Sequence, residues 1–153
     1  MLQGDYPTAL TRSQEAAEID RKRGDQGGLA ADLHQQGLIL NRLARAAQTD
    51  EERTAHRRAA IERFQQSLAT KRRIGDEAGA ADTLTELGGL LMGASQYREA
   101  IAAITEGLQI RQRLGLAARV GISLEYLGHI HELQGQYAAA LEKYQQALEL
   151  FKQ

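Results

Sequence analysis

The sequence contains no cysteine, a single proline and no excess of either charge. The absence of cysteine excludes disulfide frameworks, thiolate zinc sites and cysteine nucleophiles. Nineteen Lys and Arg residues against twenty Asp and Glu residues give a net charge of -1, which argues against nucleic-acid binding through bulk charge. No apolar run approaches the roughly 18 residues that a membrane-spanning helix needs, and no secretion signal follows Met1. We therefore expect a cytoplasmic protein that binds neither nucleic acid nor membrane.

The composition indicates a globular chain built of helices. Hydrophobic residues make up 42% and charged residues 25% of the 153 residues, which is the range of a single ordinary globular domain. Fifteen glycines accompany the single proline, a combination typical of long helices separated by glycine stops. Because β-branched residues are sparse and the alternating pattern of strands is absent, the predicted fold class is all-α.

A pattern of small residues repeats along the chain. Ala60, Ala100 and Ala140 are 40 residues apart, and Ala9 stands 51 residues before the first of them. A second small residue follows each of these alanines after seven positions, at Ala16, Ser67, Gly107 and Ala147. Glycines keep the same register, at Gly24, Gly37, Gly75, Gly88, Gly115 and Gly128. Agreement at several independent positions indicates an internal structural repeat.

The copies have the pattern of amphipathic helices. Apolar residues recur at three- and four-residue steps, as at Leu84, Leu87 and Leu91. Gly75 and Gly115 stand where such stripes end, and glycine fits the left-handed conformation that closes a helix. The pattern predicts seven helices, at residues 6–23, 29–47, 51–74, 78–93, 96–114, 118–134 and 137–152. The first is expected to stand alone, and the others form three hairpins of an A helix and a B helix.

The small residues predict close helix crossings. Gly88 and Gly128 on A helices, opposite Ala100 and Ala140 on B helices, are expected to let the two backbones approach. The second small residue of a B helix, such as Gly107, is expected to meet the A helix of the next repeat.

This combination of residues resembles the tetratricopeptide repeat. The last hairpin matches the family pattern at Leu124, Leu127, Gly128, Gly135, Tyr137, Ala140, Tyr144 and Ala147. The middle hairpin matches it at Leu84, Leu87, Gly88, Tyr97, Ala100, Ile104 and Gly107, and the first less closely at Gln36, Gly37, Ala60, Phe64 and Ser67. The resemblance covers essentially the whole chain. It implies an α-solenoid of antiparallel helix pairs, wound as a right-handed superhelix of about seven helices.

Two features depart from the family pattern. The step is 40 residues where the family commonly has 34, and each repeat closes with glycine where the family has proline. The first hairpin also has eleven additional residues between Gly37 and Ala60, about three helical turns, with a capping box at 49–52. The resemblance predicts one domain over residues 1–153, with a lone B helix at 6–23, a lengthened first repeat at 29–74, and further repeats at 78–114 and 118–152.

The resemblance places the binding surface on the concave face, which A helices line. Transferring the family's groove positions residue by residue gives His34, Gln35, Leu38, Asn41, Asp82, Thr85, Glu86, Gly89, Met92, Glu125, Tyr126, His129 and Glu132. Family members that clamp a C-terminal carboxylate use Lys and Asn at several of these positions. Here the positions are largely acidic or neutral, with Asn41 the partial exception, so a basic or mixed amphipathic peptide is the expected ligand.

Catalytic and metal sites find little support in the sequence. The glycine spacing matches no phosphate-binding loop. Glu125, His129 and Glu132 share one helix face in a geometry that suits a metal, but a solvated polar stripe is the favoured interpretation. Basic clusters such as Arg111 and Arg113 are explained as cations at helix C-termini. We expect no enzyme activity, no cofactor and no metal.

The favoured function is therefore a non-catalytic scaffold that binds a protein or peptide segment in its groove. The alternative is a peptide-sensing regulatory module of a larger signalling protein, because the repeat type resembles that of bacterial signalling regulators. A third hypothesis is an all-α enzyme that uses His129 and the nearby carboxylates.

The ends of the repeat array predict self-association. Terminal repeats normally need a polar capping helix, and the sequence has none. On the last helix, Tyr144, Leu148 and Phe151 form a face that a following A helix would cover, and the first helix, with Ala9, lacks an A partner. We expect a homodimer or end-to-end association that hides such surfaces.

Overall fold

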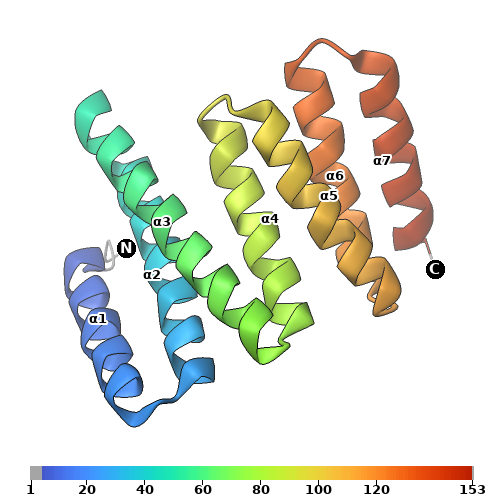
Figure 1. The fold of residues 1–153 in the computed structure, drawn as a ribbon. Helices are drawn as coiled ribbons and strands as arrows, with labels where there is room; N and C mark the ends of the chain where they lie inside the picture. Colours follow the sequence, from blue (N-terminus) through green and yellow to red (C-terminus); the bar gives the residue numbers. More distant parts are fainter. Residues whose placement is uncertain (1–4, 153) are drawn as a thin grey trace. The chain divides into compact units, whose positions relative to one another are not determined.

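The computed structural model of the chain describes residues 5–152, and in that range it contains seven helices and no strand (Figure 1). The helices are α1 (Tyr6–Arg23), α2 (Gln26–Ala46), α3 (Asp50–Ile74), α4 (Glu77–Gly93), α5 (Tyr97–Arg113), α6 (Ala117–Leu133) and α7 (Tyr137–Phe151). The all-α prediction is confirmed, and the helix boundaries agree with those predicted to within three residues.

Side-chain caps explain where several helices begin and end. The largest difference from the predicted boundaries is at α2, which begins at Gln26 because the Asp25 carboxylate accepts a hydrogen bond from the Gly28 amide at 2.9 Å. The amide of Glu52 donates to the Thr49 hydroxyl at 3.1 Å and so starts α3. At the other end of α3, Gly75 has a φ of 76°, a left-handed conformation that glycine adopts without strain.

The chain divides into two compact units, Met1–Asp76 and Glu77–Gln153. In the first unit, α2 packs against both α1 and α3. The eleven additional residues give α2 and α3 lengths of 21 and 25 residues. A buried amide also joins the first two helices, since Gln36 donates to the carbonyl oxygen of Ser13 at 3.1 Å.

In the second unit, two hairpins follow one another in the same register. The hairpin of α4 and α5 begins its helices at Glu77 and Tyr97, and the hairpin of α6 and α7 begins its helices 40 residues later, at Ala117 and Tyr137. Helix α6 packs against α7 and also against α5 and α4 of the preceding hairpin. The 40-residue step of the sequence is therefore a step from one hairpin to the next.

In each hairpin, a large side chain of the second helix packs on a glycine of the first helix. A Cβ atom at Gly37 would lie 2.7 Å from the Phe64 ring, and one at Gly128 would lie 2.7 Å from the Tyr144 ring. A Cβ atom at Gly88 would overlap Ile104, whose side chain is fully buried. Ala100 also approaches Gly88, because the same Cβ atom would lie 3.4 Å from the Ala100 carbonyl oxygen, so the predicted close crossing of these two residues is confirmed.

The second small residue of the B helix does not face the next repeat, so this prediction was wrong. A Cβ atom at Gly107 would lie 3.2 Å from the carbonyl oxygen of Ala81, on α4 of the same hairpin. In the first unit, the hydroxyl of Ser67 donates to the carbonyl oxygen of Ala30 at 2.7 Å. Both small residues of a B helix face their own A helix because seven residues are two helical turns.

Two neighbouring glycines of α4 provide a test of this packing. We expect Gly88→Ala to lower the free energy of unfolding by about 1–3 kcal/mol, because the new methyl group displaces Ile104 from a filled core. Gly89→Ala is the matched control: its Cβ atom would meet its nearest neighbour, Tyr126, at 3.4 Å, and alanine favours the helix by up to about 1 kcal/mol. Urea unfolding of the full chain measures both, and equal effects of the two substitutions would contradict the packing argument.

Candidate functional site

Four of the residues predicted for the groove come together on α6. Glu125, Tyr126, His129 and Glu132 lie at three- and four-residue steps and share one face of the helix. Together with Ile122 of α6 and Tyr144 of α7 they line a cavity of about 600 Å³. We call this the α6 cavity.

The α6 cavity carries negative charge and a polar aromatic wall. The Tyr144 hydroxyl donates a hydrogen bond to the Glu132 carboxylate at 3.0 Å. Partial burial raises the pKa of Tyr144, and the hydrogen bond to Glu132 and the charges of Glu132 and Glu125 raise it further. Tyr144 therefore stays a neutral hydrogen-bond donor. The carboxylates of Glu125 and Glu132, which line the cavity, offer acceptors to a cation.

Sequence reasoning did not assign two residues of the α6 cavity to the groove. Ile122 is 42% exposed and lies one turn before Tyr126, so helical spacing alone was the signal for it. Tyr144 was predicted on the face of the last helix that a following A helix would cover; it packs on Gly128 of its own hairpin, and its hydroxyl reaches the cavity. The large residue that closes the hairpin thus also forms part of the site.

Asp82, also predicted for the groove, is held in an ion network inside the second unit. Its carboxylate accepts from Arg111 of α5 at 2.9 Å and pairs with Arg119 of α6. Arg111 also donates to the Ser123 hydroxyl at 2.7 Å and is only 4% exposed. The Asp82 carboxylate therefore connects three helices and is not a free acceptor for a ligand.

The pKa of Asp82 follows from this network. Burial alone would raise the pKa, but hydrogen bonds from Arg119 and Arg111 and their positive charges outweigh burial and lower it. Arg111 lies in the last turn of α5, as predicted, and the tertiary structure in addition buries it beside Asp82. Arg113 is exposed and pairs with Glu77 at 2.6 Å.

The remaining predicted positions are less available or lie in the other unit. Thr85 is buried and donates its hydroxyl to the carbonyl oxygen of Ala81 at 3.1 Å, and Glu86 and Met92 are half-buried. The first predicted set lies on α2 in the first unit: His34, Gln35, Leu38 and Asn41. His34 contacts the Phe64 ring edge-on at 5.2 Å between centroids. A groove that runs through all three sets stays a prediction.

Comparisons with known proteins agree with this arrangement of helices. The family model described as "Tetratricopeptide repeat" matches residues 79–153. These residues belong to the tetratricopeptide repeat family. Members of the family generally mediate protein–protein interactions.

Solved structures extend the likeness in fold to the whole chain. The structure of BtubC (BKLC) from P. vanneervenii matches with a TM-score of 0.64 at 17% identity, over 99% of this chain and 66% of that chain. The structure of MamA matches with a TM-score of 0.55 at 17% identity, over 99% of this chain and 82% of that chain. At such identities the likeness concerns the fold. No curated protein matches the sequence.

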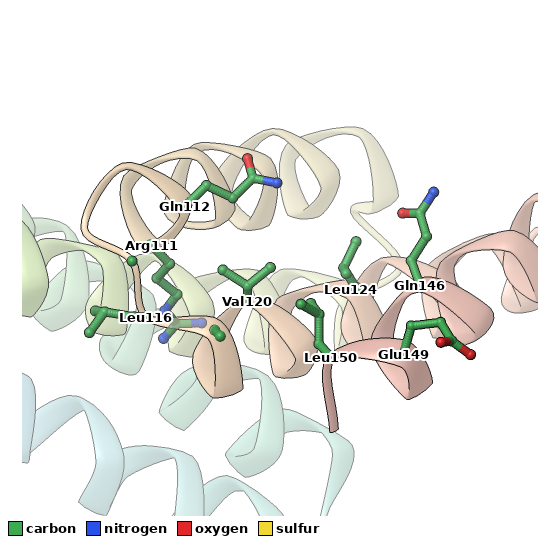
Figure 2. Close-up of a pocket in the computed structure, with 10 residues that line it drawn as sticks. Arg111, Gln112, Leu116, Val120, Leu124, Gln146, Glu149 and Leu150 are labelled. Carbon is green, nitrogen blue, oxygen red and sulfur yellow. The ribbon is translucent and has the colours of Figure 1, made fainter. Parts of the chain in front are cut away.

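A second cavity of the tetratricopeptide repeats is apolar and lies elsewhere. It has a volume of about 540 Å³ and is formed where α5, α6 and α7 meet. Figure 2 shows Leu116, Val120, Leu124 and Leu150 around it, with Gln112, Gln146 and Glu149 beside them. None of these residues was predicted for the groove. The guanidinium group of Arg111 at its end is engaged by Asp82 and Ser123.

Residues 5–152 contain neither a metal-binding cluster nor a membrane-spanning helix. No group of three or more His, Asp and Glu side chains there is arranged to hold a metal ion. This applies to Glu125, His129 and Glu132, which share a face without forming such a group. No helix in the same range is both long and apolar enough to span a membrane.

The ion network predicts the cost in stability of removing the Asp82 carboxylate. Asp82→Ala leaves the buried Arg111 without its carboxylate, and we expect a loss of about 2–3 kcal/mol, below the 3–5 kcal/mol of fully buried pairs because the Asp82 side chain is 37% exposed. The exposed pair of Glu77 is the control, and Glu77→Ala should cost at most about 1 kcal/mol.

The same variant has a defined pH dependence. Because the pKa of Asp82 is lower in the folded than in the unfolded chain, its stabilisation is fully present above the unfolded value of 3.8 and is lost as the pH falls through the folded value. The difference in unfolding free energy between wild type and Asp82→Ala should therefore shrink in acid. A difference that stays constant down to the acid end of the titration would contradict the role of this carboxylate.

Proposed function

We propose that this protein is a non-catalytic scaffold that binds a segment of another protein in the α6 cavity. The convergence of Glu125, Tyr126, His129 and Glu132 on one cavity of about 600 Å³ carries the proposal. A volume of this size accommodates one or two large side chains. The family supports the class of function, because tetratricopeptide repeats mediate protein–protein interactions.

The lining of the cavity favours a basic side chain as the anchor of the ligand. Glu125 and Glu132 are exposed carboxylates, and no Lys or Arg lines the cavity. The rings of Tyr126 and Tyr144 supply faces that a guanidinium or ammonium group can contact. A peptide-sensing regulatory module would use the same cavity, so the test below applies to both functions.

Selection from a random peptide library tests this proposal. We expect peptides selected on the full chain to be rich in Lys and Arg, and we expect Tyr126→Ala and Glu125→Lys each to weaken their binding at least about tenfold, or 1.4 kcal/mol. Glu99→Lys on α5 makes the same charge change at an exposed residue that does not line the cavity, and it should leave affinity unchanged. Selected peptides that bind all variants equally would refute the proposal.

Self-association is a second candidate, favoured by one observation on α7. This helix exposes large apolar side chains over its whole length, at Tyr137 (71%), Leu141 (57%), Leu148 (53%) and Phe151 (48%). Helix α1 exposes only one such side chain among the described residues, Ile19. Pairing of two α7 helices around a two-fold axis accounts for this asymmetry better than a stack of unlike ends.

Light scattering of the full chain at micromolar concentration tests this candidate. We expect a mass above 16.8 kDa that falls to the monomer value on Leu148→Glu, because a charge in the centre of the apolar stripe opposes its burial. A monomer that Leu148→Glu does not change would remove this candidate.

A further inference from the structure

The second unit contains its own example of a helix docked on a hairpin. Helix α6 packs against α5 and α4, and its contacts with α4 are specific. Arg119 pairs with Asp82, and Tyr126 lies against Gly89, where an added Cβ atom would be 3.4 Å from the ring. Both contacts join residues 37 positions apart, so α6 lies parallel to α4 in a fixed register.

The hairpin of α6 and α7 offers the equivalent surface 40 residues later. Asp82 and Gly89 correspond to Ile122 and His129, and both of these line the α6 cavity. The cavity therefore occupies, on the second hairpin, the position that α6 fills on the first. By this equivalence the cavity lies where a further A helix of the array would pack.

Exposure on the B helices shows how far this docking position extends. Leu108 of α5 is 9% exposed, whereas its counterpart Leu148 of α7 is 53% exposed. Arg111 is 4% exposed, whereas its counterpart Phe151 is 48% exposed. Because the two hairpins share one register, these differences mark the strip of α7 that a further helix would cover.

We propose that the partner segment is an amphipathic α-helix that docks across α6 and α7 as α6 docks across α4 and α5. This inference rests on the proposed function and specifies the class of its ligand. The helix extends the repeat array from another protein, with its apolar stripe on Leu148 and Phe151 and its flank over the α6 cavity.

The register of 37 residues defines the side chains that such a helix carries. Arg119 of α6 pairs with Asp82 of α4, and the same register of 37 residues aligns positions 122 and 129 of α6 with positions 85 and 92 of α4. The counterparts of those three α4 positions on the second hairpin are Ile122, Glu125 and Glu132. The partner helix therefore has an apolar residue opposite Ile122 and basic residues three and ten positions later, opposite the two carboxylates.

The chain's own A helices do not carry this pattern. The positions to compare are those equivalent to residues 119, 122 and 129 of α6. There α6 has Arg119, Ile122 and His129; α4 has Gly79, Asp82 and Gly89; and α2 has Gly28, Ala31 and Leu38. None of the three has Lys or Arg at either position that would face the carboxylates. The A helices of a second copy are thus poor occupants, and the surface fits a basic helix of a different protein.

A peptide designed from α6 tests the inference. The probe has the sequence of Ala117–Leu133 with Arg119→Leu, Ile122→Lys and His129→Lys, so that its side chains match Ile122, Glu125 and Glu132 of the protein. We expect the labelled probe to bind the full chain by fluorescence anisotropy, with a gain in helical circular dichroism on mixing. The unmodified peptide, and the probe with Leu124→Pro, should each bind at least about tenfold more weakly.

Variants of the protein separate a docked helix from a peptide held in the cavity alone. Leu148→Glu, on the exposed face of α7, should weaken probe binding at least about tenfold. Gln146→Glu adds the same charge beside the other cavity, shown in Figure 2, and should leave probe binding unchanged. Equal binding of the probe and its proline variant, or no effect of Leu148→Glu, would overturn the inference.

The remaining outcomes distinguish this inference from the proposed function and from a second copy. Library peptides that bind the wild type but not Tyr126→Ala would show that the cavity binds peptides. If the probe does not bind in the same assay, the helix inference fails. If the chain is a dimer that Leu148→Glu dissociates, dissociation by the probe supports the inference. A dimer that the probe leaves intact assigns the α7 face to the second copy and overturns it.

Discussion

Every hairpin of this protein depends on a close crossing in which a large side chain of one helix rests on a glycine of the other. Phe64 on Gly37, Ile104 on Gly88 and Tyr144 on Gly128 repeat this contact with different side chains. A methyl group at the glycine would occupy the volume of the large residue, so the distance between the helices is fixed by sterics. Because the crossing recurs every 40 residues in the second unit, its two hairpins present the same faces in the same order.

This repetition leaves the last hairpin with a surface built to receive a helix. In the second unit α6 covers the hairpin before it, whereas among the described residues no helix covers the corresponding strip of α7. The exposed apolar side chains and the α6 cavity adjoin one another through Tyr144, which packs on Gly128 and binds Glu132. The crossing that stabilises the hairpin thereby also shapes the wall of the candidate site.

Equivalent positions of the two hairpins have different roles because their neighbours differ. Asp82 accepts from two arginines and ties α4 to α5 and α6. Its counterpart Ile122 has no such network and lines the α6 cavity. An array of repeats can thus use a polar position for internal docking in one copy and leave the same position apolar for a partner in another.

Much of the fold could be predicted from the sequence because its signals are local. Helix periodicity, the cap at Thr49 and the left-handed glycine at Gly75 act within a few residues of chain, and the boundaries followed from them. The repeat register, with its step of 40 residues and the longer step of 51 in the first hairpin, identified the glycine positions at the crossings. Local signals could not show which large residue rests on each glycine, nor that Gly107 faces its own hairpin, since both depend on the rotation of one helix against another.

The candidate site divides in the same way. The sequence by itself determined that Glu125, Tyr126, His129 and Glu132 share a helix face, because helical spacing requires it. Only the tertiary structure decided that they meet Tyr144 in a cavity and that Asp82 is taken up by Arg111 and Arg119. The reason is that charge pairing and burial depend on residues 29 and 37 positions away in the chain, which become neighbours only when α4, α5 and α6 pack together.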